Sequence, residues 1–322
     1  MARYLVRRFF ASIVVVLGVT LITLVLMDQT RGTYVPGIDL NPALRPEDIA
    51  RLRADLGLDR PFYLWYLTWI WAVLHGDFGR SMIDGSPVTS HILDRLPNTL
   101  ELTGTAVLLG VLISVPLGVI GALRRGSRTD HGLTVVSVAG FAVPQFWMGL
   151  MLILVFSVTF QHYGLPWLPS SGAFSAVNGG DILDRLQHLI LPATVLAFFY
   201  LSIWSRFTRS SMLEVLSQDY IRTARAKGMS ERRVVYLHGL RNALIPLVTL
   251  VGLELPGLVS GGLVVEVVFG WPGIGKLAFE RALQYDYSTV MGITFFATLL
   301  VVAGNLLADV LYAILDPRIR YA

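Results

Sequence analysis

Six long apolar runs, almost free of charge, limit what this chain can fold into. A helix of about 20 apolar residues crosses the hydrocarbon core of a bilayer, and each run is roughly that long or longer. The runs cover residues 9–27, 102–123, 132–160, 186–205, 242–265 and 287–315. Charged residues make up only 15% of the chain, whereas soluble domains carry about 25%. The sequence therefore predicts an all-α integral membrane protein with six transmembrane helices.

Arginine and lysine are distributed unequally among the short loops between these runs. Because cytoplasmic loops hold the excess of basic residues, the distribution predicts that both termini are cytoplasmic. The same bias accounts for the net charge of +4 without a nucleic-acid partner. Basic residues on the cytoplasmic side are Arg3, Arg7, Arg8, Arg124, Arg125, Arg128, Arg206, Arg209, Arg222, Arg225, Lys227, Arg232, Arg233, Arg241, Arg318 and Arg320. Those in the short external loops are Arg185, Lys276 and Arg281.

The expected organisation has four parts. Residues 1–27 form a cytoplasmic N-terminus and a retained first span, because the apolar run is too long for a typical cleaved signal peptide. Residues 28–98 form an external segment. Residues 99–316 form the transmembrane core, with a cytoplasmic loop at about 206–241, and residues 317–322 form a cytoplasmic tail. The chain has no cysteine, so disulfides and thiolate metal sites are excluded.

Two helices are expected in the external segment. RPEDIARLRADLG, residues 45–57, predicts a short helix, with Pro46 in its first turn and Gly57 as its stop. RPFYLWYLTWIWAVLHGDFG, residues 60–79, predicts a second helix whose Trp and Tyr side chains suit the headgroup level of a membrane. The same aromatic side chains equally suit the core of a small external cap, and the two interpretations are compatible.

The stretch GWPGIGKL, residues 270–277, fits seven of the eight positions of the phosphate-binding pattern G-x-x-x-x-G-K-[ST]. The eighth is leucine, so the hydroxyl that would bind Mg²⁺ is missing, and the stretch is predicted to lie outside, where ATP is absent. A P-loop also needs a surrounding soluble α/β domain, which nothing here predicts. The stretch is therefore expected to form an external tight turn or re-entrant loop. The residues that would shape it are Gly270, Pro272, Gly273 and Gly275.

The cytoplasmic loop after the fourth run predicts two short helices separated by a glycine. Ser217 is a good N-cap for the first helix, Gly228 can end it, and Ser230 can cap the second. Ala224 and Gly228 are four residues apart and form a small-residue strip that another surface could approach closely. Charge alone would predict only an ordinary basic cytoplasmic loop.

At this loop the residues resemble a known family. DYIRTARAKGMSERRVVYLHGLRNALIPLVT is similar to the EAA-type coupling segment of ABC-importer permeases, in the form found in dipeptide and oligopeptide permeases. The likeness extends over nearly the whole chain, through LRADLGLDRP, YLTWIWAVLHGDFGRSM, RRGSRTDH, VPQFWMGLMLIL, FGWPGIGKL and NLLADVLYAILDPRIR. Two places depart from it. DQTRGTYVPGIDLNP stands where the family often has a Pro-Gly-Asp-Pro turn, and Glu254 stands where a neutral polar residue is expected.

The resemblance implies a transmembrane permease subunit, not an enzyme, in the bacterial cytoplasmic (inner) membrane. It would form half of the translocation pathway for di- or oligopeptides and couple to cytoplasmic ATPases through the 214–240 loop. The implied partners are a second homologous permease subunit, two ATPase subunits or one fused pair, an external substrate-binding protein and the lipid bilayer. ATP and Mg would bind in the ATPase subunits, with no cofactor in this chain.

The family's coupling residues can be carried over by position. The E-A-A-x-x-x-G pattern falls on Arg222, Thr223, Ala224 and Gly228, and its first two positions differ as they do in peptide permeases. The full set of expected coupling residues is Asp219, Tyr220, Arg222, Thr223, Ala224, Ala226, Lys227, Gly228, His238 and Arg241. His238 could also sense pH, although a structural polar contact is the commoner role.

Polar residues inside the apolar runs are costly there, so by default they face a cavity or a partner. Glu254, Asn305 and Asp309 are the candidates for lining the translocation pathway, where Glu254 would meet a cationic group such as a peptide amino terminus. The alternative is a carboxyl group kept neutral or hydrogen-bonded at a subunit interface. Glu101 and Glu266, near the outer ends of their runs, are expected at the membrane interface.

Other functions stay open. The same importer class also carries nickel, glutathione and oligosaccharides, with specificity residing largely in the binding protein. A secondary transporter would use intramembrane carboxylates for proton coupling and would not need the coupling loop. A membrane-embedded enzyme would need polar residues clustered at one depth, and the sequence has no HExxH or GxSxG motif. The six histidines are scattered, so no metal site is predicted.

Overall fold

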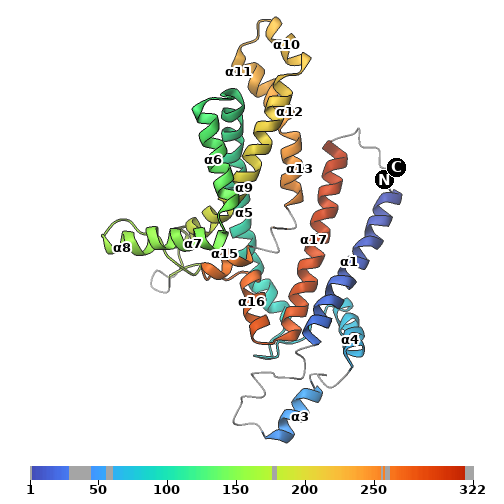
Figure 1. Ribbon diagram of the computed structural model, residues 1–322. Coiled ribbons are helices and arrows are strands. Elements are labelled where there is room, and N and C mark those ends of the chain that lie inside the picture. Colours follow the sequence, from blue (N-terminus) through green and yellow to red (C-terminus); the bar gives the residue numbers. More distant parts are fainter. Residues whose placement is uncertain are drawn as a thin grey trace.

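The structure is a computed structural model that describes residues 2–28, 45–55, 61–175, 180–254, 257 and 262–315. Within these ranges the chain is helical, with one isolated β-bridge and no strand, and six stretches are long and apolar enough to cross a membrane. Figure 1 shows four long helices, α1 (Ala2–Asp28), α5 (Val88–Leu123), α9 (Ile182–Leu216) and α17 (Tyr287–Leu315). Helices α10 (Asp219–Ala226) and α11 (Glu231–Arg233) lie at one end, and α3 (Pro46–Asp55), α4 (Phe62–Leu74) and α16 (Ile274–Leu283) at the other. The predicted all-α fold is confirmed.

The centre of the bundle is the pair α5 and α9, which run in the same direction. A carbon atom added at Gly110 would lie 2.9 Å from the Cβ of Tyr200, and one added at Gly118 would lie 2.5 Å from the Cβ of Thr208. Glycines therefore let the two helices approach closely, as small residues do in membrane bundles. Trp204 is buried beside Tyr200, with the two rings stacked at 4.8 Å between centroids, so aromatic packing completes the contact.

The third span differs from the continuous helix predicted over 132–160. Helix α6 (Arg128–Ala142) ends before Pro144, and α7 (Gln145–Leu152), the π-helix η1 (Ile153–Thr159) and α8 (Phe160–His162) follow. Proline disfavours helical backbone at the residue before it, and Val143 is extended, with φ −77° and ψ 123°. In Figure 1, α7 and α8 run across the direction of α6. The predicted single span is therefore two helical segments that run in different directions, α6 and the segment made of α7, η1 and α8.

Three other boundaries also differ from the predicted ones. Helix α5 begins at Val88, so the end of the predicted external segment 28–98 forms its first turns. Helix α9 continues to Leu216, beyond the predicted end at 205. The fifth apolar stretch begins at Glu231 rather than at 242. It contains η2 (Val234–Leu240), α12 (Arg241–Ala243) and α13 (Ile245–Leu253), and α15 (Leu263–Val268) follows. Hydropathy locates apolar residues, whereas a helix continues through polar residues until its backbone bonding ends.

The two helices predicted in the external segment are present. In α4 one face packs on the bundle, because the Tyr66 hydroxyl donates to the Leu17 carbonyl at 2.9 Å and Trp69 is buried. The other face leaves Tyr63 and Trp71 54% and 67% exposed. Core packing therefore explains one set of aromatics, and the membrane-interface interpretation stays a prediction for the other.

Some predictions fall outside the described residues. Helix α3 begins at Pro46, as predicted, but its predicted stop, Gly57, is outside the described ranges. So are residues 29–44, which hold most of the departing stretch DQTRGTYVPGIDLNP, and the tail 317–322.

Candidate functional site

The loop that matches the P-loop pattern, which is predicted to be external, is wrapped around a carboxylate of this same chain. Glu266, on α15, is fully buried. Its Oε1 accepts a hydrogen bond from the Thr99 hydroxyl at 2.9 Å, and its Oε2 accepts one from the Lys276 amide at 2.9 Å. The Thr99 hydroxyl oxygen accepts a third bond, from the Ile274 amide, at 2.8 Å. A buried carboxylate needs such donors, and we call Glu266, Thr99 and loop 270–276 the carboxylate cradle.

Two glycines of the carboxylate cradle lie where no side chain fits. A carbon atom added at Gly273 would lie 2.2 Å from the Oε1 atom of Glu266, and one added at Gly275 would lie 2.9 Å from the Cα of Leu263. Gly270 has φ 57°, in the left-handed region that favours glycine. The glycines of a P-loop let its backbone approach a phosphate. Here the same spacing lets the backbone approach an internal carboxylate.

Trp271 and Pro272 attach the carboxylate cradle to the central helices. The Trp271 indole donates to the Asn98 carbonyl at 2.9 Å, and the Asn98 side-chain amide donates to the Pro272 carbonyl at 3.0 Å. The Arg185 guanidinium lies over the Trp271 ring, 5.4 Å from its centroid, and forms an ion pair with Glu101. Since Asn98 and Arg185 belong to α5 and α9, the loop is fixed to both.

The two glutamates predicted at the membrane interface, Glu101 and Glu266, therefore differ from each other. Glu266 is fully buried inside the protein, and its predicted depth at the membrane interface stays a prediction. The Glu101 side chain keeps 31% of its surface exposed and is bound to Arg185, so its interfacial position stays a prediction.

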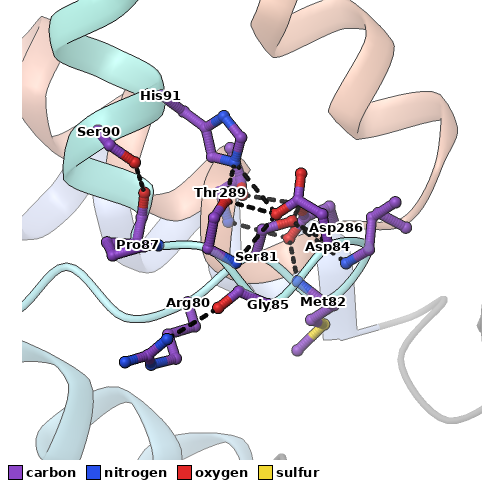
Figure 2. A network of polar contacts seen from close by, with 12 residues as sticks. Arg80, Ser81, Met82, Asp84, Gly85, Pro87, Ser90, His91, Asp286 and Thr289 are labelled. Carbon is purple, nitrogen blue, oxygen red and sulfur yellow. Dashed lines mark hydrogen bonds and ion pairs between the residues drawn. The ribbon is translucent and has the colours of Figure 1, made fainter.

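A second buried carboxylate joins the start of α17 to the external segment before α5 (Figure 2). Asp286 accepts hydrogen bonds from the Ser81 hydroxyl at 2.7 Å, the Met82 amide at 3.0 Å and the Thr289 hydroxyl at 2.7 Å. It is fully buried, so these donors replace the water that its charge has lost. Sequence reasoning missed this contact, since no motif or apolar period marks Asp286.

Asp84 extends this network to α16. Its Oδ2 accepts a hydrogen bond from Arg281 Nη2 at 2.8 Å, and Arg281 Nη1 lies 3.7 Å from Asp286. A hydrogen bond from the Ser86 hydroxyl, with further bonds from the Ser86 amide, Arg281 and His91, holds the pKa of Asp84 well below its usual range. Asp84 is thus ionised at any physiological pH, and these turns are joined by charge as well as by packing.

The loop after α9 contains the two predicted short helices, α10 and α11, and a glycine break. Gly228 lies just after the end of α10 and has φ 76°, a left-handed conformation in which a side chain would be strained. Ile221, Ala224 and Val234 are buried against one another. Arg225 Nη2 lies 2.6 Å from an oxygen of Glu231 across the turn. We call residues 219–243 the cytoplasmic hairpin, after the side of the membrane on which the charge distribution predicts it.

Two details of the cytoplasmic hairpin differ from prediction. Gln218, not Ser217, is the N-cap of α10, because Ser217 caps the end of α9 and its hydroxyl donates to the Glu214 carbonyl at 2.7 Å. Ser230 stands at the predicted N-cap of α11, but its side chain makes no capping bond. Ala224 is only 7% exposed and is buried inside the hairpin, so of the predicted small-residue strip only Gly228 is open to an approaching surface.

The expected coupling residues lie in two places. His238 and Arg241 line a groove of about 550 Å³ with Asn242, Leu244 and Ile245. The other exposed members are on or next to α10, where Asp219 and Arg222 form an ion pair at 3.3 Å yet leave 95% and 73% of their side chains exposed. The remaining exposed members there are Tyr220, Thr223, Ala226, Lys227 and Gly228. An exposed pair contributes little to stability, so these charges are available to a partner.

His238 lies in the π-helix η2, which sequence reasoning missed. The helix has one extra residue in each hydrogen-bonded turn compared with an α-helix, a form that is rare and frequently found at functional sites. Asn242 follows it and donates to the His238 carbonyl at 2.9 Å and to the Tyr220 hydroxyl at 3.1 Å. The groove and α10 are therefore in direct contact.

The intramembrane candidates are not joined by a contact among the described residues. Glu254 follows α13, is half-buried, and lies near enough to Tyr200 of α9 to interact with it electrostatically. Asn305 is half-buried on α17. The side chain of Asp309 lies outside the described part of the chain. In the described ranges no cluster of three His, Asp or Glu side chains is placed to bind a metal ion.

An ion pair between the buried Asp130 and the half-buried Arg209 joins α6 to α9 near the cytoplasmic hairpin. Arg209 donates to Asp130 through Nε at 2.6 Å and through Nη2 at 2.7 Å, and the Gly126 amide donates to Asp130 at 2.9 Å. The Arg209 guanidinium, followed by the Gly126 amide, lowers the pKa of Asp130 to about 2. The Ser127 hydroxyl caps α6 by accepting from the Asp130 amide at 3.3 Å, so this turn is rigid.

Comparison with known proteins gives matches along the whole chain. The family model described as the binding-protein-dependent transport system inner membrane component matches residues 114–321. The model for the N-terminal part of that membrane component matches residues 1–103. Together they leave unmatched only residues 104–113, inside α5, and the last residue of the sequence.

Curated relatives match over their full length. The chain is 46% identical over 322 residues to the oligopeptide transport system permease protein AppB of Bacillus subtilis, covering 100% of both. It is 38% identical over 342 residues to the dipeptide transport system permease protein DppB of Escherichia coli K12, and 40% identical over 340 residues to the di/tripeptide permease DppB of Pseudomonas aeruginosa. In both of these comparisons, 100% of this chain and 99% of the relative are covered.

Solved structures share the fold at lower identity. The inward-facing MetNI methionine ABC transporter has a chain with a TM-score of 0.56 and 16% identity, which covers 71% of this chain and 97% of its own. A chain of an amino acid ABC transporter solved with histidines has a TM-score of 0.51 and 16% identity, with 70% and 94% covered.

Proposed function

This chain belongs to the family of binding-protein-dependent transport system inner membrane components, and we propose that it is the permease subunit of an ATP-driven importer for di- or oligopeptides. The observation that carries the proposal is the full-length similarity to peptide permeases, at 46% and 38% identity. The six apolar helical stretches and the family place it in the bacterial inner membrane.

In the proposed mechanism the chain forms half of a gated pathway, and a second homologous permease subunit forms the other half. An external binding protein delivers the peptide to the side that carries α3, α4 and α16. Binding there needs a surface of fixed shape, and the carboxylate cradle and the Asp286 network supply rigidity on that side.

We assign coupling with the ATPases to the cytoplasmic hairpin. Helix α9 runs almost directly into it, and α13 leaves it, so a displacement of the hairpin reaches two membrane helices through continuous backbone. The buried contact of Ile221, Ala224 and Val234 lets the hairpin move as a unit, which transmission between discrete arrangements requires. Its exposed charges, Asp219 and Arg222, would meet the ATPase surface.

ATP and Mg would bind only in two ATPase subunits or one fused pair. The P-loop look-alike has no place for a phosphate, because Glu266 occupies the concave side of the loop. We expect the purified chain alone to neither bind nor hydrolyse ATP, as measured with a fluorescent ATP analogue and by phosphate release. Saturable ATP binding by the isolated chain would contradict this.

Orientation can be tested because the chain has no cysteine. We expect Gln284→Cys, at the exposed end of α16, to react with an impermeant thiol reagent on intact cells. Ser230→Cys, in the cytoplasmic hairpin, should react only after the cells are opened. The reverse pattern would place the hairpin outside, where ATPases cannot reach it.

The transport function can be tested with the complete complex in vesicles that also receive the binding protein. We expect uptake of a labelled dipeptide or oligopeptide that requires ATP. Uptake driven by a proton gradient without ATP would support a secondary transporter instead. ATP-dependent uptake of nickel, glutathione or an oligosaccharide, with no peptide uptake, would keep the importer class and replace the substrate.

Glu254, Asn305 and Asp309 are proposed to line the pathway, with Glu254 facing a cationic group such as a peptide amino terminus. The half-buried position of Glu254 at the end of α13 supports this proposal. We expect Glu254→Gln to lower uptake of peptides with a free amino terminus more than uptake of amino-acetylated ones. Unchanged uptake of every transported substrate would remove Glu254 from the pathway.

A further inference from the structure

A groove of about 650 Å³ lies between α6 and α9, on a side of the bundle that the proposed function does not use. Its lining includes Thr134, Phe141, Ile203, Arg206, Phe207 and Arg209. The two arginines are at one end of this set, and the remaining side chains are mainly apolar. The groove therefore combines a basic end with an apolar floor.

The depth of the groove follows from the length of the apolar run on α9. Residues 186–205 make roughly 30 Å of helix, which is about the thickness of the hydrocarbon core. Arg206 is the first charged residue after that run, so it lies at headgroup level. Asp130 and Arg209 are hydrogen-bonded to each other, so the two residues lie at about the same depth in the membrane. Phe141, further along α6, is then about 16 Å deeper in the membrane.

The basic end of the groove carries more positive than negative charge. Arg206 is exposed, and in the described part of the chain it has neither a hydrogen bond nor an ion pair. Arg209 is held in place by Asp130 through two of its nitrogen atoms, and its side chain is still 32% exposed. Asp130 is itself buried and bound, so it leaves little negative charge for Arg206. Arg124, Arg125 and Arg128 are exposed on the adjoining turn.

We propose that this groove binds an anionic phospholipid of the cytoplasmic leaflet. Its phosphate accepts hydrogen bonds from Arg206 and from the free edge of Arg209, and an acyl chain lies along Ile203, Phe207 and Phe141. Guanidinium groups match phosphate oxygens in geometry, and basic pockets between helices on the cytoplasmic side suit anionic headgroups. An apolar protein helix in the groove would instead bury the charge of Arg206 without a partner. Only the choice of leaflet rests on the orientation proposed above.

The first test measures lipid retention by native mass spectrometry of the complex, purified with equal amounts of phosphatidylglycerol and phosphatidylcholine. We expect the wild type to retain phosphatidylglycerol preferentially. Arg206→Gln should lower that preference about fivefold, which converts the roughly 1 kcal/mol that one arginine contributes at a membrane surface. The matched control is Arg7→Gln, an exposed arginine on α1, which should leave the preference unchanged. Equal loss in both variants, or in neither, would overturn the proposal.

Two further measurements separate the lipid from other occupants. A photo-crosslinking residue at Phe207, which is 48% exposed, should give an adduct with the mass of one phospholipid. An adduct with a second permease chain would overturn the proposal and make the groove a subunit interface. Inorganic phosphate at millimolar concentration should not displace phosphatidylglycerol, since it lacks the acyl chain. Complete displacement would reduce the site to an anion site. Lipid retention by the purified complex does not depend on which side of the membrane the groove faces, so the result holds whichever way the chain is oriented.

Discussion

The carboxylate cradle and the cytoplasmic hairpin are both glycine-containing connections between membrane spans, and they use their charges in opposite ways. In the carboxylate cradle, Glu266 is fully buried and its oxygens accept bonds from Thr99 and Lys276. In the cytoplasmic hairpin, Asp219 and Arg222 have little besides each other and solvent, with 95% and 73% of their side chains exposed.

This difference separates a connection that fixes the fold from one that is open to a partner. A buried, hydrogen-bonded carboxylate determines the path of the backbone around it, and losing it leaves donors unpaired. Exposed charges contribute little to stability and can change without unfolding the protein. Substitutions in the two regions should therefore affect different measurements.

The largest expected effect is that of Glu266→Ala. It would leave the Thr99 hydroxyl and the Lys276 amide without acceptors in a buried site, so we expect a loss of about 3–5 kcal/mol in the free energy of unfolding. Denaturant unfolding in detergent micelles measures this. Glu280→Ala is the control, because the Glu280 side chain is 46% exposed and its loss should cost less than about 0.5 kcal/mol. Equal stability of the two variants would mean that the carboxylate cradle does not fix the fold.

Gly273→Ala should have the next largest effect. The added carbon atom would lie 2.2 Å from Glu266 Oε1, so the loop or the carboxylate must shift, at a cost of about 1–3 kcal/mol in unfolding free energy. Gly132→Ala on α6 is the matched control, since nothing lies within 4 Å of its added carbon atom. It should be neutral or stabilise by up to about 1 kcal/mol. A variant of Gly273 as stable as the wild type would show that the loop can open without loss.

Arg222→Glu should affect transport and leave stability unchanged. It places two like charges side by side on the exposed face of α10, so ATP-dependent uptake and substrate-stimulated ATP hydrolysis should fall about tenfold, equivalent to about 1.4 kcal/mol of coupling. The unfolding free energy should stay within about 0.5 kcal/mol. Arg7→Glu, exposed on α1, makes the same charge change and should leave both activities intact. Normal uptake by the Arg222 variant would exclude this face from coupling.

The smallest effect concerns the Asp130–Arg209 pair. Because the folded protein lowers the pKa of Asp130 to about 2, below the usual value of about 3.9, the pair contributes fully above pH 4. Its contribution is lost as the pH falls from about 4 toward 2. The difference in unfolding free energy between the wild type and Asp130→Asn should therefore be constant from pH 5 to 8 and shrink only below about pH 4. A difference that changes between pH 6 and 7 would contradict the assignment.

Some of these features were readable from the sequence. The six apolar stretches follow from hydropathy alone, and the family follows from motifs distributed along the chain. The break before Pro144 could also be predicted, because proline restricts the backbone of Val143. It was missed because the apolar run continues through Pro144 without interruption. The burial of Glu266 was not, since it depends on how the following loop folds back. The bond between Ser81 and Asp286 joins residues 205 positions apart, and no local pattern reports such a contact.

The near-direct passage of α9 into the cytoplasmic hairpin makes that helix a lever. From Leu216 back to Pro192, the proline inside the helix, α9 is about 36 Å long. A rotation of about 5° imposed at the hairpin end would carry the Pro192 end sideways by about 3 Å, if the helix turns as a rod. That is roughly the width of a water molecule, so an angular step too small to disturb the packing at the pivot can open or close a passage at the far end. The proline then marks the natural limit of the rod, because helices bend where that residue interrupts their bonding.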